Sequence, residues 1–345
     1  MKFILKILFI LSLHSVLQAS EIDFVAETQP VRSMGDAADD PAIWFNAKDP
    51  SKSLIFGTDK GKGIHVYDLN GKELSFSKLG ATNNIDLRVI DERVHIVVSN
   101  RSMSTLDYWV FNEDGLFDYF LKNPDNSFNE DTTHYHLKTN MDVYGVCMGV
   151  LEGKPIAAIT QEEGPNVQIW DLLNNTITHT FSVIADEKKP PLSGNEAEGC
   201  VFDDENHVLL VSREGSRGYL KAYNTKDYSY LKTVDSRDQN IVGDPEGVTI
   251  YKTSTTEGYV LLSSQGGNEF NVYDRKSLKF IKKFTVNNVQ DTDGIDVISK
   301  KVNEMFPRGF LVVQDGRNLP ENQNFKIVSM DEVLKKKLSH HGSTH

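Results

Sequence analysis

Short apolar runs separated by turn residues dominate the chain. β-branched and aromatic residues fill segments such as 63–74, 166–175 and 270–284, and Gly, Asn or polar residues interrupt them. Runs of this length with polar turns between them are typical of β-hairpins. Helical periodicity is nearly absent, and the one good helix candidate covers residues 329–338. The pattern therefore predicts an all-β protein with a short C-terminal helix.

The predicted hairpins are themselves arranged in a longer sequence repeat. An acid-rich or glycine-containing turn introduces an apolar strand at residues 38–45, 83–90, 142–150, 196–204, 244–251 and 291–298. A second apolar strand that ends in a polar turn follows each of them, at residues 54–61, 95–102, 157–164, 209–216, 260–267 and 310–316. The period of roughly 50 residues matches one four-stranded propeller blade. We therefore expect a six-bladed β-propeller with four-stranded antiparallel blades; a β-sandwich or a β-helix is the structural alternative.

The N-terminal segment differs from the repeats. Lys2 and Lys6 flank an apolar stretch that small residues follow, which is typical of a secretory signal peptide cleaved near Ala19 or Ser20. The stretch is too short to span a membrane, and the alternative is a buried N-terminal helix. We expect a signal peptide at 1–19 and a single domain at 20–345, with its blades over roughly 27–330. The mature protein is then secreted or periplasmic and monomeric, without membrane attachment.

The overall charge narrows the choice of partners. The 345-residue chain has a formal net charge of −12, and loss of Lys2 and Lys6 with the signal peptide changes it to −14 (−12 − 2). A chain this acidic repels nucleic acid and anionic membranes, so neither is expected as a partner. An acidic exported protein is instead suited to bind hard cations such as calcium.

Cysteine and histidine give weaker signals. Cys147 and Cys200 are the only cysteines, which excludes a disulfide-rich scaffold. They could pair in an oxidising compartment, but the sequence favours two small buried thiols. No Cys/His cluster has zinc-finger spacing. His134 and His136 occupy alternate positions of an expected strand or loop, and we interpret them as structural.

Acidic residues gather in the repeated turns. In a propeller, equivalent turns of successive blades converge on one end of the central channel. Carboxylates occupy such turns at Asp39, Asp40, Asp86, Glu198, Glu214, Asp244, Glu246, Asp293 and Asp315. Crowding them without counterions is unfavourable, and calcium, which binds six to eight oxygens, is the fitting cation. Lys60 and Arg101 add positive charge to the same ring, which suits a phosphate-rich substrate; the alternative is a set of solvated turns.

Several of these motifs resemble those of a known family. Residues 26–44, 83–88, 99–102, 142–145, 196–199, 244–251, 263–267, 291–297 and 314–326 resemble the β-propeller phytases, the calcium-dependent alkaline 3-phytases of bacteria. The likeness covers roughly residues 25–330, in order and across all six blades. It implies a calcium-dependent phosphomonoesterase that removes phosphates stepwise from inositol hexakisphosphate.

The resemblance also implies site residues. The catalytic calcium cluster would use Glu27, Asp39, Glu198, Glu214, Asp244, Glu246, Gln265 and Asp293. A separate structural calcium would take Asp40, the carbonyl groups of Pro41 and Ile85, and Asp315 and Asn318. The substrate would contact Lys60, Lys62, Arg101, Tyr144 and Glu163. Of these residues, Asp39, Glu198, Glu214, Glu246, Lys60, Arg101 and Tyr144 would carry the chemistry.

Three positions depart from the family pattern. Glu162 stands where a lysine is usual, and Lys60-Gly61-Lys62 replaces two consecutive lysines. Arg317 stands where an acid is expected. One phosphate contact is therefore lost or replaced in this chain.

The expected chemistry is attack of metal-activated water on phosphorus without a covalent protein intermediate, with an optimum at neutral to alkaline pH. Two other functions remain open at this stage. One is a different calcium-dependent propeller hydrolase, such as a lactonase, because a fold does not fix a function. Lys60 and Arg101 argue against it, since a neutral lactone needs no phosphate clamp. The other is a binding module without catalytic activity.

Overall fold

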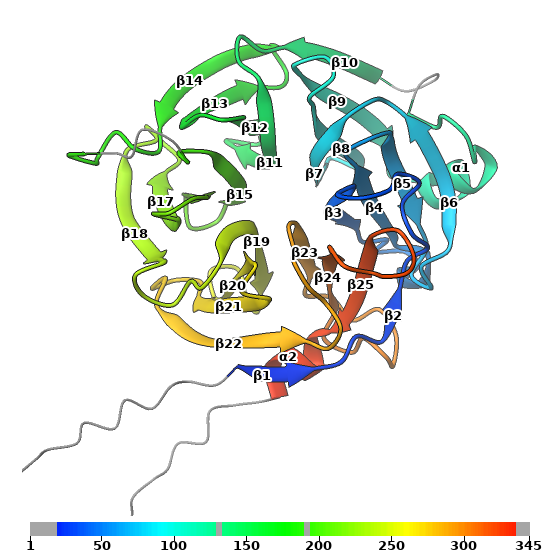
Figure 1. Ribbon diagram of the computed structural model, residues 1–345. Helices are drawn as coiled ribbons and strands as arrows, with labels where there is room; N and C mark the ends of the chain where they lie inside the picture. Colours follow the sequence, from blue (N-terminus) through cyan, green and yellow to red (C-terminus); the bar gives the residue numbers. More distant parts are fainter. Residues whose placement is uncertain (1–18, 129–132, 190–193, 336–345) are drawn as a thin grey trace, which may run out of the picture.

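The computed structural model describes residues 19–128, 133–189 and 194–335. Six β-sheets are set around one central axis, which confirms the six-bladed propeller (Figure 1). Apart from Ala19, the predicted signal peptide lies outside the described residues. None of the described helices is long and apolar enough to cross a membrane.

Each blade is an antiparallel sheet whose strands run outward from the axis in sequence order. From the innermost strand outward, blade 1 consists of β3 (Ala38–Trp44), β4 (Leu54–Asp59), β5 (Gly63–Tyr67) and β6 (Glu73–Lys78). Blade 2 consists of β7 (Thr82–Ile90), β8 (Arg93–Asn100), β9 (Thr105–Asn112) and β10 (Thr133–Lys138). Blade 3 consists of β11 (Val143–Leu151), β12 (Lys154–Gln161), β13 (Asn166–Asp171) and β14 (Thr176–Ser182). Blades 4 and 5 consist of β15 (Ala197–Asp203), β16 (Val208–Arg213), β17 (Tyr219–Asn224) and β18 (Tyr230–Ser236), and of β19 (Asp244–Lys252), β20 (Gly258–Gln265), β21 (Glu269–Asp274) and β22 (Phe280–Val286).

Blade 6 joins the two ends of the chain. Its inner strands are β23 (Ile295–Ile298), β24 (Phe310–Asp315) and β25 (Asn324–Ser329), and its outermost strand is β2 (Ala26–Glu27). The register of β2 on β25 pairs Ala26 with Ile327 and Glu27 with Lys326. In addition, β1 (Ser20–Ile22) lies parallel to β22, so blade 5 has a fifth strand that the repeat did not predict. The N-terminal strands thus hold the last two blades.

The hydrophobic core is divided into six layers, one between each pair of neighbouring blades. Each of the six buried apolar clusters draws its residues from two adjacent blades, including the pair formed by blades 6 and 1. This arrangement follows from strands that are apolar on both faces, because both faces of a blade pack against a neighbour. The ring is therefore closed by hydrophobic packing as well as by β2.

The innermost strands carry a β-bulge at a recurring position. The register of the first strand on the second shifts between Ala38 and Pro41 in blade 1, and equivalent shifts occur in blades 2 to 5. The residues skipped by the bulges include Asp39, Tyr144, Glu198 and Glu246. Bulges re-aim side chains next to functional sites. The bulges thus set these polar residues apart from the regular strand pairing at one end of the ring.

Neighbouring blades approach each other closely at the bulges. A Cβ atom at Gly199 would overlap the backbone carbonyl of Glu246 in the next blade, and one at Gly145 would overlap that of Glu198. Hydroxyl groups of the second strands complete the contact: Ser212 Oγ donates to the Glu246 carbonyl at 2.7 Å. Ser263 Oγ donates to the Asp293 carbonyl at 2.6 Å. Gly145 and Gly199 are therefore required by the packing of neighbouring blades.

Two α-helices accompany the blades in the part of the chain that the structure describes. The predicted C-terminal helix is confirmed as α2 (Met330–Lys335); Ser329 ends β25, and residues 336–338 of the predicted segment lie outside the described residues. A second helix, α1 (Leu116–Lys122), was not expected from the sequence. It has only seven residues, too few for a clear helical period. Its buried Leu116 and Phe120 pack into the core layer between blades 1 and 2, so tertiary contacts hold it.

The expectation of two buried thiols is wrong, because the structure joins Cys147 and Cys200 in a disulfide. Both residues lie on innermost strands, Cys147 in β11 and Cys200 in β15, with Cα atoms 5.6 Å apart. Their side chains belong to the core layer between blades 3 and 4. The bond therefore links two blades covalently, a pairing that only the spatial adjacency of the blades could reveal.

Replacing both cysteines by serine should destabilise the protein. The bond spans 53 residues, and closing a loop of that size constrains the unfolded chain by about 4 kcal/mol in the loop-entropy model. Denaturant unfolding should report a loss of this order, and a reductant should lower the stability of the wild type but not that of the variant. Titration of two free thiols per unreduced, denatured chain would contradict the pairing.

Candidate functional site

Three glutamates meet at the end of the channel where the bulges lie. Glu198 and Glu246 come from bulges of blades 4 and 5, and Glu214 comes from the turn after β16. One carboxylate oxygen of each lies within 4.8 Å of the others. Glu198 and Glu246 are only 3% and 4% exposed. The structure thus brings together three acids that are far apart in the sequence.

Lys60 joins this cluster to the carboxylates of blades 1 and 6. Its Nζ lies 3.1 Å from Asp39 Oδ1, 3.0 Å from Asp293 Oδ2 and 3.0 Å from Asp36 Oδ1. Gln265 donates from Nε2 to the other oxygen of Asp293. Asp39 and Asp293 contribute electrostatically to the environment of Glu198, so the two groups form one cluster. It contains five carboxylates, two of which, Asp39 and Asp293, pair with Lys60, and Asp36 lies at its exposed edge.

Tyr144 and Arg101 lie on one side of the cluster. Tyr144, in the bulge of blade 3, lies close enough to Glu198 and Glu214 for their charges to raise its pKa. The Arg101 guanidinium carbon is 5.6 Å from the centre of the Tyr144 ring. Arg101 also forms an ion pair with Glu162 and donates to Asn83 Oδ1 at 3.3 Å. Glu162 therefore already neutralises the cation that was expected to hold phosphate.

Burial and mutual repulsion shift the acidity of the cluster. Burial, followed by the charges of Glu246 and Glu214, raises the pKa of Glu198 well above its usual range, and burial with neighbouring acids does the same for Glu246. Burial and the charge of Glu196 raise the pKa of Glu214 to about 7. The charge of Glu198 raises the pKa of Tyr144 further than burial does. Without a cation, the charged forms of these carboxylates are therefore disfavoured.

The donor set fits a hard divalent cation. Glu198 Oε2, Glu214 Oε1 and Asp39 Oδ2 are buried and have no hydrogen-bond partner among the described residues. Buried carboxylate oxygens without a donor are costly, and a cation between them removes that cost. The ligand atoms on offer are all oxygens, which is the preference of calcium and not of zinc or copper. Glu198, Glu214, Glu246, Asp39 and Asp293 are the residues that would hold it.

Other sequence-predicted ligands lie in different surroundings. Asp244 pairs with Arg237 at 2.9 Å and accepts from the Gly215 amide at 2.9 Å. Glu27 forms an ion pair with Lys326, an interaction in which a lysine supplies the positive charge. The same Lys326 lies 3.4 Å from Asp315 Oδ2 and donates to Asn318 Oδ1 at 2.8 Å. Lys326 ends the 314–326 motif, but the sequence analysis gave it no role, because a motif does not show which acids a lysine contacts.

Asp40 belongs to yet another group. Its Oδ2 accepts from the Ile85 amide of blade 2 at 3.1 Å, while Pro41 pairs with Gly57 across β3 and β4. Within the described residues, no hydrogen bond or ion pair joins Asp40 to Asp315 or Asn318. The contacts therefore do not gather the ligands expected for one structural calcium, and that ion stays a prediction.

The channel continues below the cluster. A cavity of about 470 Å³ is lined by all six innermost strands and begins one residue beyond the site acids, at Asp40, Gly199 and Gly247. Asp86 lies in this part of the channel, where it accepts from the Met148 amide of blade 3 at 2.8 Å. Asp296 accepts from the Ile43 amide of blade 1 at 2.8 Å. These deeper carboxylates therefore connect blades, as Asp40 does.

The departures from the family pattern also have definite places. Lys62 donates from Nζ to the Arg32 carbonyl oxygen at 2.6 Å, an exposed contact outside the cluster. Arg317 pairs with Asp291 at 2.7 Å. Glu163 follows Glu162 in the turn after β12, and its amide donates to Glu196 Oε1 at 2.9 Å. Lys62 and Glu163 thus lie in the predicted turns, but neither makes a contact with the carboxylate cluster in the described residues.

Comparisons with known proteins agree with this geometry. A family model described as "Phytase" matches residues 4–342. The 3-phytase of Bacillus subtilis (strain 168) is 32% identical over 327 residues, which are 89% of this chain and 83% of that protein. The chain belongs to the phytase family.

Solved structures share the architecture of this phytase at low identity. A luciferin-regenerating enzyme superposes with a TM-score of 0.53 at 11% identity, over 88% of this chain and 96% of that one. A chain of a nidogen/laminin complex superposes with a TM-score of 0.50 at 15% identity, over 75% of this chain and 84% of that one. Likeness at this level of identity concerns the fold alone.

The metal-free phytase should lose stability as the pH rises from about 4.5 to about 7. Glu214 has a raised pKa of about 7 in the folded state against 4.5 in the unfolded chain, so in this window the folded state holds the proton more tightly. Melting temperatures measured with chelator should fall through the window, and Glu214→Gln should reduce the slope.

Calcium should reverse this trend, because it competes with protons for the same carboxylates. The rise in melting temperature on adding calcium should therefore grow between pH 5 and pH 7. A slope that is equal in the wild type and in Glu214→Gln would contradict the assignment of Glu214 to the cluster.

Proposed function

We propose that this phytase is a calcium-dependent 3-phytase that releases phosphate stepwise from inositol hexakisphosphate. The observation that carries the proposal is the cluster around Glu198, Glu214 and Glu246, in which oxygens of Glu198, Glu214 and Asp39 are buried without a hydrogen-bond partner among the described residues. Lys60 pairs with Asp39, and Arg101 lies beside Tyr144, so two cations flank the cluster. The name of the Bacillus subtilis relative supports the activity. Calcium, when bound, supplies positive charge that neutralises phosphate and makes water easier to deprotonate.

The residues of the chain have separate roles in this proposal. Lys60 and Arg101 bind phosphate oxygens and stabilise the charge on the transferring phosphoryl group. Tyr144, which lies near Glu214 and against Arg101, orients the substrate between them. Glu214 is the carboxylate suited to orient the attacking water, because it lies in the cluster with an oxygen that has no hydrogen-bond partner among the described residues. Together with Asp39, Glu198, Glu246 and Asp293, it would hold the cation.

Two further features belong to the proposal. All six blades of one chain surround the channel end, so a monomer contains the whole site. The signal peptide pattern at residues 1–19 supports a secreted or periplasmic enzyme, the setting in which the Cys147–Cys200 disulfide is stable. The two cations beside the carboxylates favour a phosphate ester over a neutral lactone.

Glu198→Gln should lower the turnover of calcium-phytate by roughly a hundredfold or more, because the amide keeps the shape but removes charge that offsets the cation. Phosphate release is measured with calcium and with a chelator, and the wild type should be active only with calcium. Glu304→Gln, an exposed acid far from the cluster in sequence and structure, is the matched control. Activity that persists in chelator would refute calcium dependence, and near-normal activity of Glu198→Gln would refute the cluster.

Glu162→Gln should lower the KM for calcium-phytate by roughly threefold to tenfold at low salt, because it releases Arg101 from its ion pair. Glu162→Lys, which restores the cation usual in the family, should lower KM at least as much. The effect should shrink as salt is added. Glu152→Gln, in the turn at the opposite end of the same blade, should leave KM unchanged. An unchanged KM in both Glu162 variants would mean that Arg101 does not bind the substrate.

A further inference from the structure

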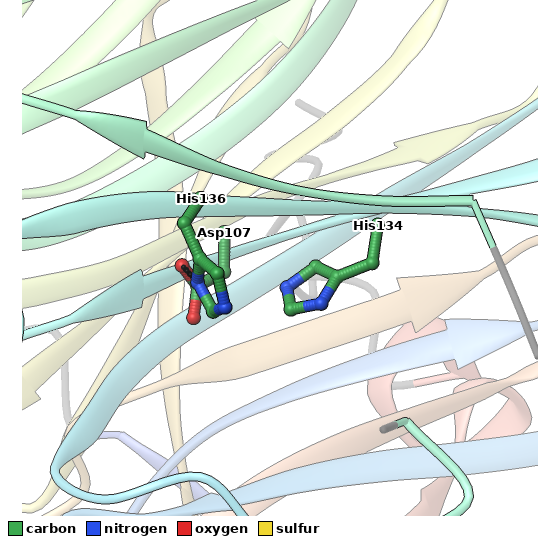
Figure 2. Close-up of side chains that lie close together, drawn as sticks. All are labelled: Asp107, His134 and His136. Carbon is green, nitrogen blue, oxygen red and sulfur yellow. Dashed lines mark hydrogen bonds and ion pairs between the residues drawn. The ribbon is translucent and has the colours of Figure 1, made fainter. Parts of the chain in front are cut away.

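Two histidines and an aspartate meet on the outer half of blade 2, away from the channel. His134 and His136 belong to the outermost strand β10, and Asp107 belongs to the neighbouring β9. Alternate residues of a strand face the same side, and the antiparallel register sets His136 opposite Asp107 and His134 opposite Trp109. The three side chains therefore lie on one face of the blade (Figure 2).

Their nitrogen and oxygen atoms are close enough to share one ion. One ligand atom of each residue lies within 4.8 Å of the other two, and His136 Nδ1 is 2.7 Å from Asp107 Oδ1. The His134 ring points toward the other two side chains (Figure 2). Its Nε2 is buried and has no hydrogen-bond partner among the described residues. A buried ring nitrogen without a partner is an available ligand.

Neighbouring residues hold the three side chains in place. Asp107 is fully buried, and it accepts from Thr105 Oγ1 at 2.7 Å and from Asn100 Nδ2 at 3.0 Å. The His134 ring stacks on Trp109 with ring centres 4.3 Å apart. Hydrogen bonds and packing of this kind orient the ligands of metal sites.

We propose that Asp107, His134 and His136 bind a divalent transition-metal cation. Zinc represents this class of cation in the binding experiments. Two imidazole nitrogens and one carboxylate suit zinc, cobalt, nickel or copper, whereas calcium prefers oxygen ligands alone. Three protein ligands leave a fourth position for water. On binding, the His136–Asp107 hydrogen bond is replaced by two bonds to the metal. The ion links the outermost strand β10 to β9, and it is separate from the carboxylate cluster of the channel.

The site is measurable by calorimetric titration of the full chain with zinc chloride, in a buffer that contains excess calcium. His340, His341 and His345 lie outside the described residues, and Asn replaces all three in the background chain so that they add no imidazole ligands. This background should bind one equivalent of zinc with micromolar affinity or better. His134→Asn and His136→Asn should each weaken binding at least about tenfold. His179→Asn, an exposed histidine on the outermost strand of blade 3, should have no effect.

Three further measurements separate metal binding from folding and from catalysis. Cobalt should give the visible absorption of a four-coordinate site in the background chain and not in the double variant His134→Asn/His136→Asn. In the unsubstituted protein, zinc should protect His134 and His136 from acylation by diethyl pyrocarbonate, a readout that needs no variant. Calcium-dependent phosphate release should be equal in the double variant and the background. Absent zinc binding, unchanged binding in the double variant, or unprotected histidines would overturn the proposal.

Discussion

The innermost strands of neighbouring blades come into backbone contact at their bulges, and both the ring and the site depend on that contact. In blades 3, 4 and 5 an acid or a tyrosine in the bulge is followed by a glycine, as in Glu198-Gly199 and Tyr144-Gly145. The glycine lets the backbone of the next blade approach. The residue before it belongs to the same bulge, which places its side chain at the channel end. The same dipeptides therefore specify the packing and present the functional groups.

This arrangement places stability and function in opposition. The acids that gather at the channel end raise one another's pKa values, and several of their oxygens are buried without a donor. Lys60 offsets only part of this charge. Around Lys326 the charge of the acids is balanced within the protein, because this buried lysine lies among Glu27, Asp315 and Asn318. A fixed internal cation stabilises that region, whereas the acids of the channel end have buried oxygens without a partner among the described residues, an arrangement that suits a cation from the solvent.

Most of the architecture could be predicted from the sequence, because each blade repeats a local pattern of turns and apolar strands. The carboxylate cluster could be predicted for the same reason, since equivalent turns converge in any propeller. What the sequence could not reveal depends on contacts between blades or on tertiary packing. The Cys147–Cys200 bond, the ion pair of Arg101 with Glu162 and the meeting of Asp107 with His134 each join residues from separate strands or turns. The short helix α1 escaped prediction because its packing, and not its periodicity, stabilises it.

The pairing of β2 with β25 has a consequence for the order in which the chain can fold. Residues 26 and 27 leave the ribosome early, but their partners Ile327 and Lys326 are among the last residues of the domain to be made. Hairpins of the first five blades can form as synthesis proceeds, whereas blade 6 and the core layer between blades 6 and 1 must wait for nearly the whole chain. A chain that is truncated before β25 therefore exposes apolar faces at both ends of an open arc, and it is a natural substrate for chaperones and proteases.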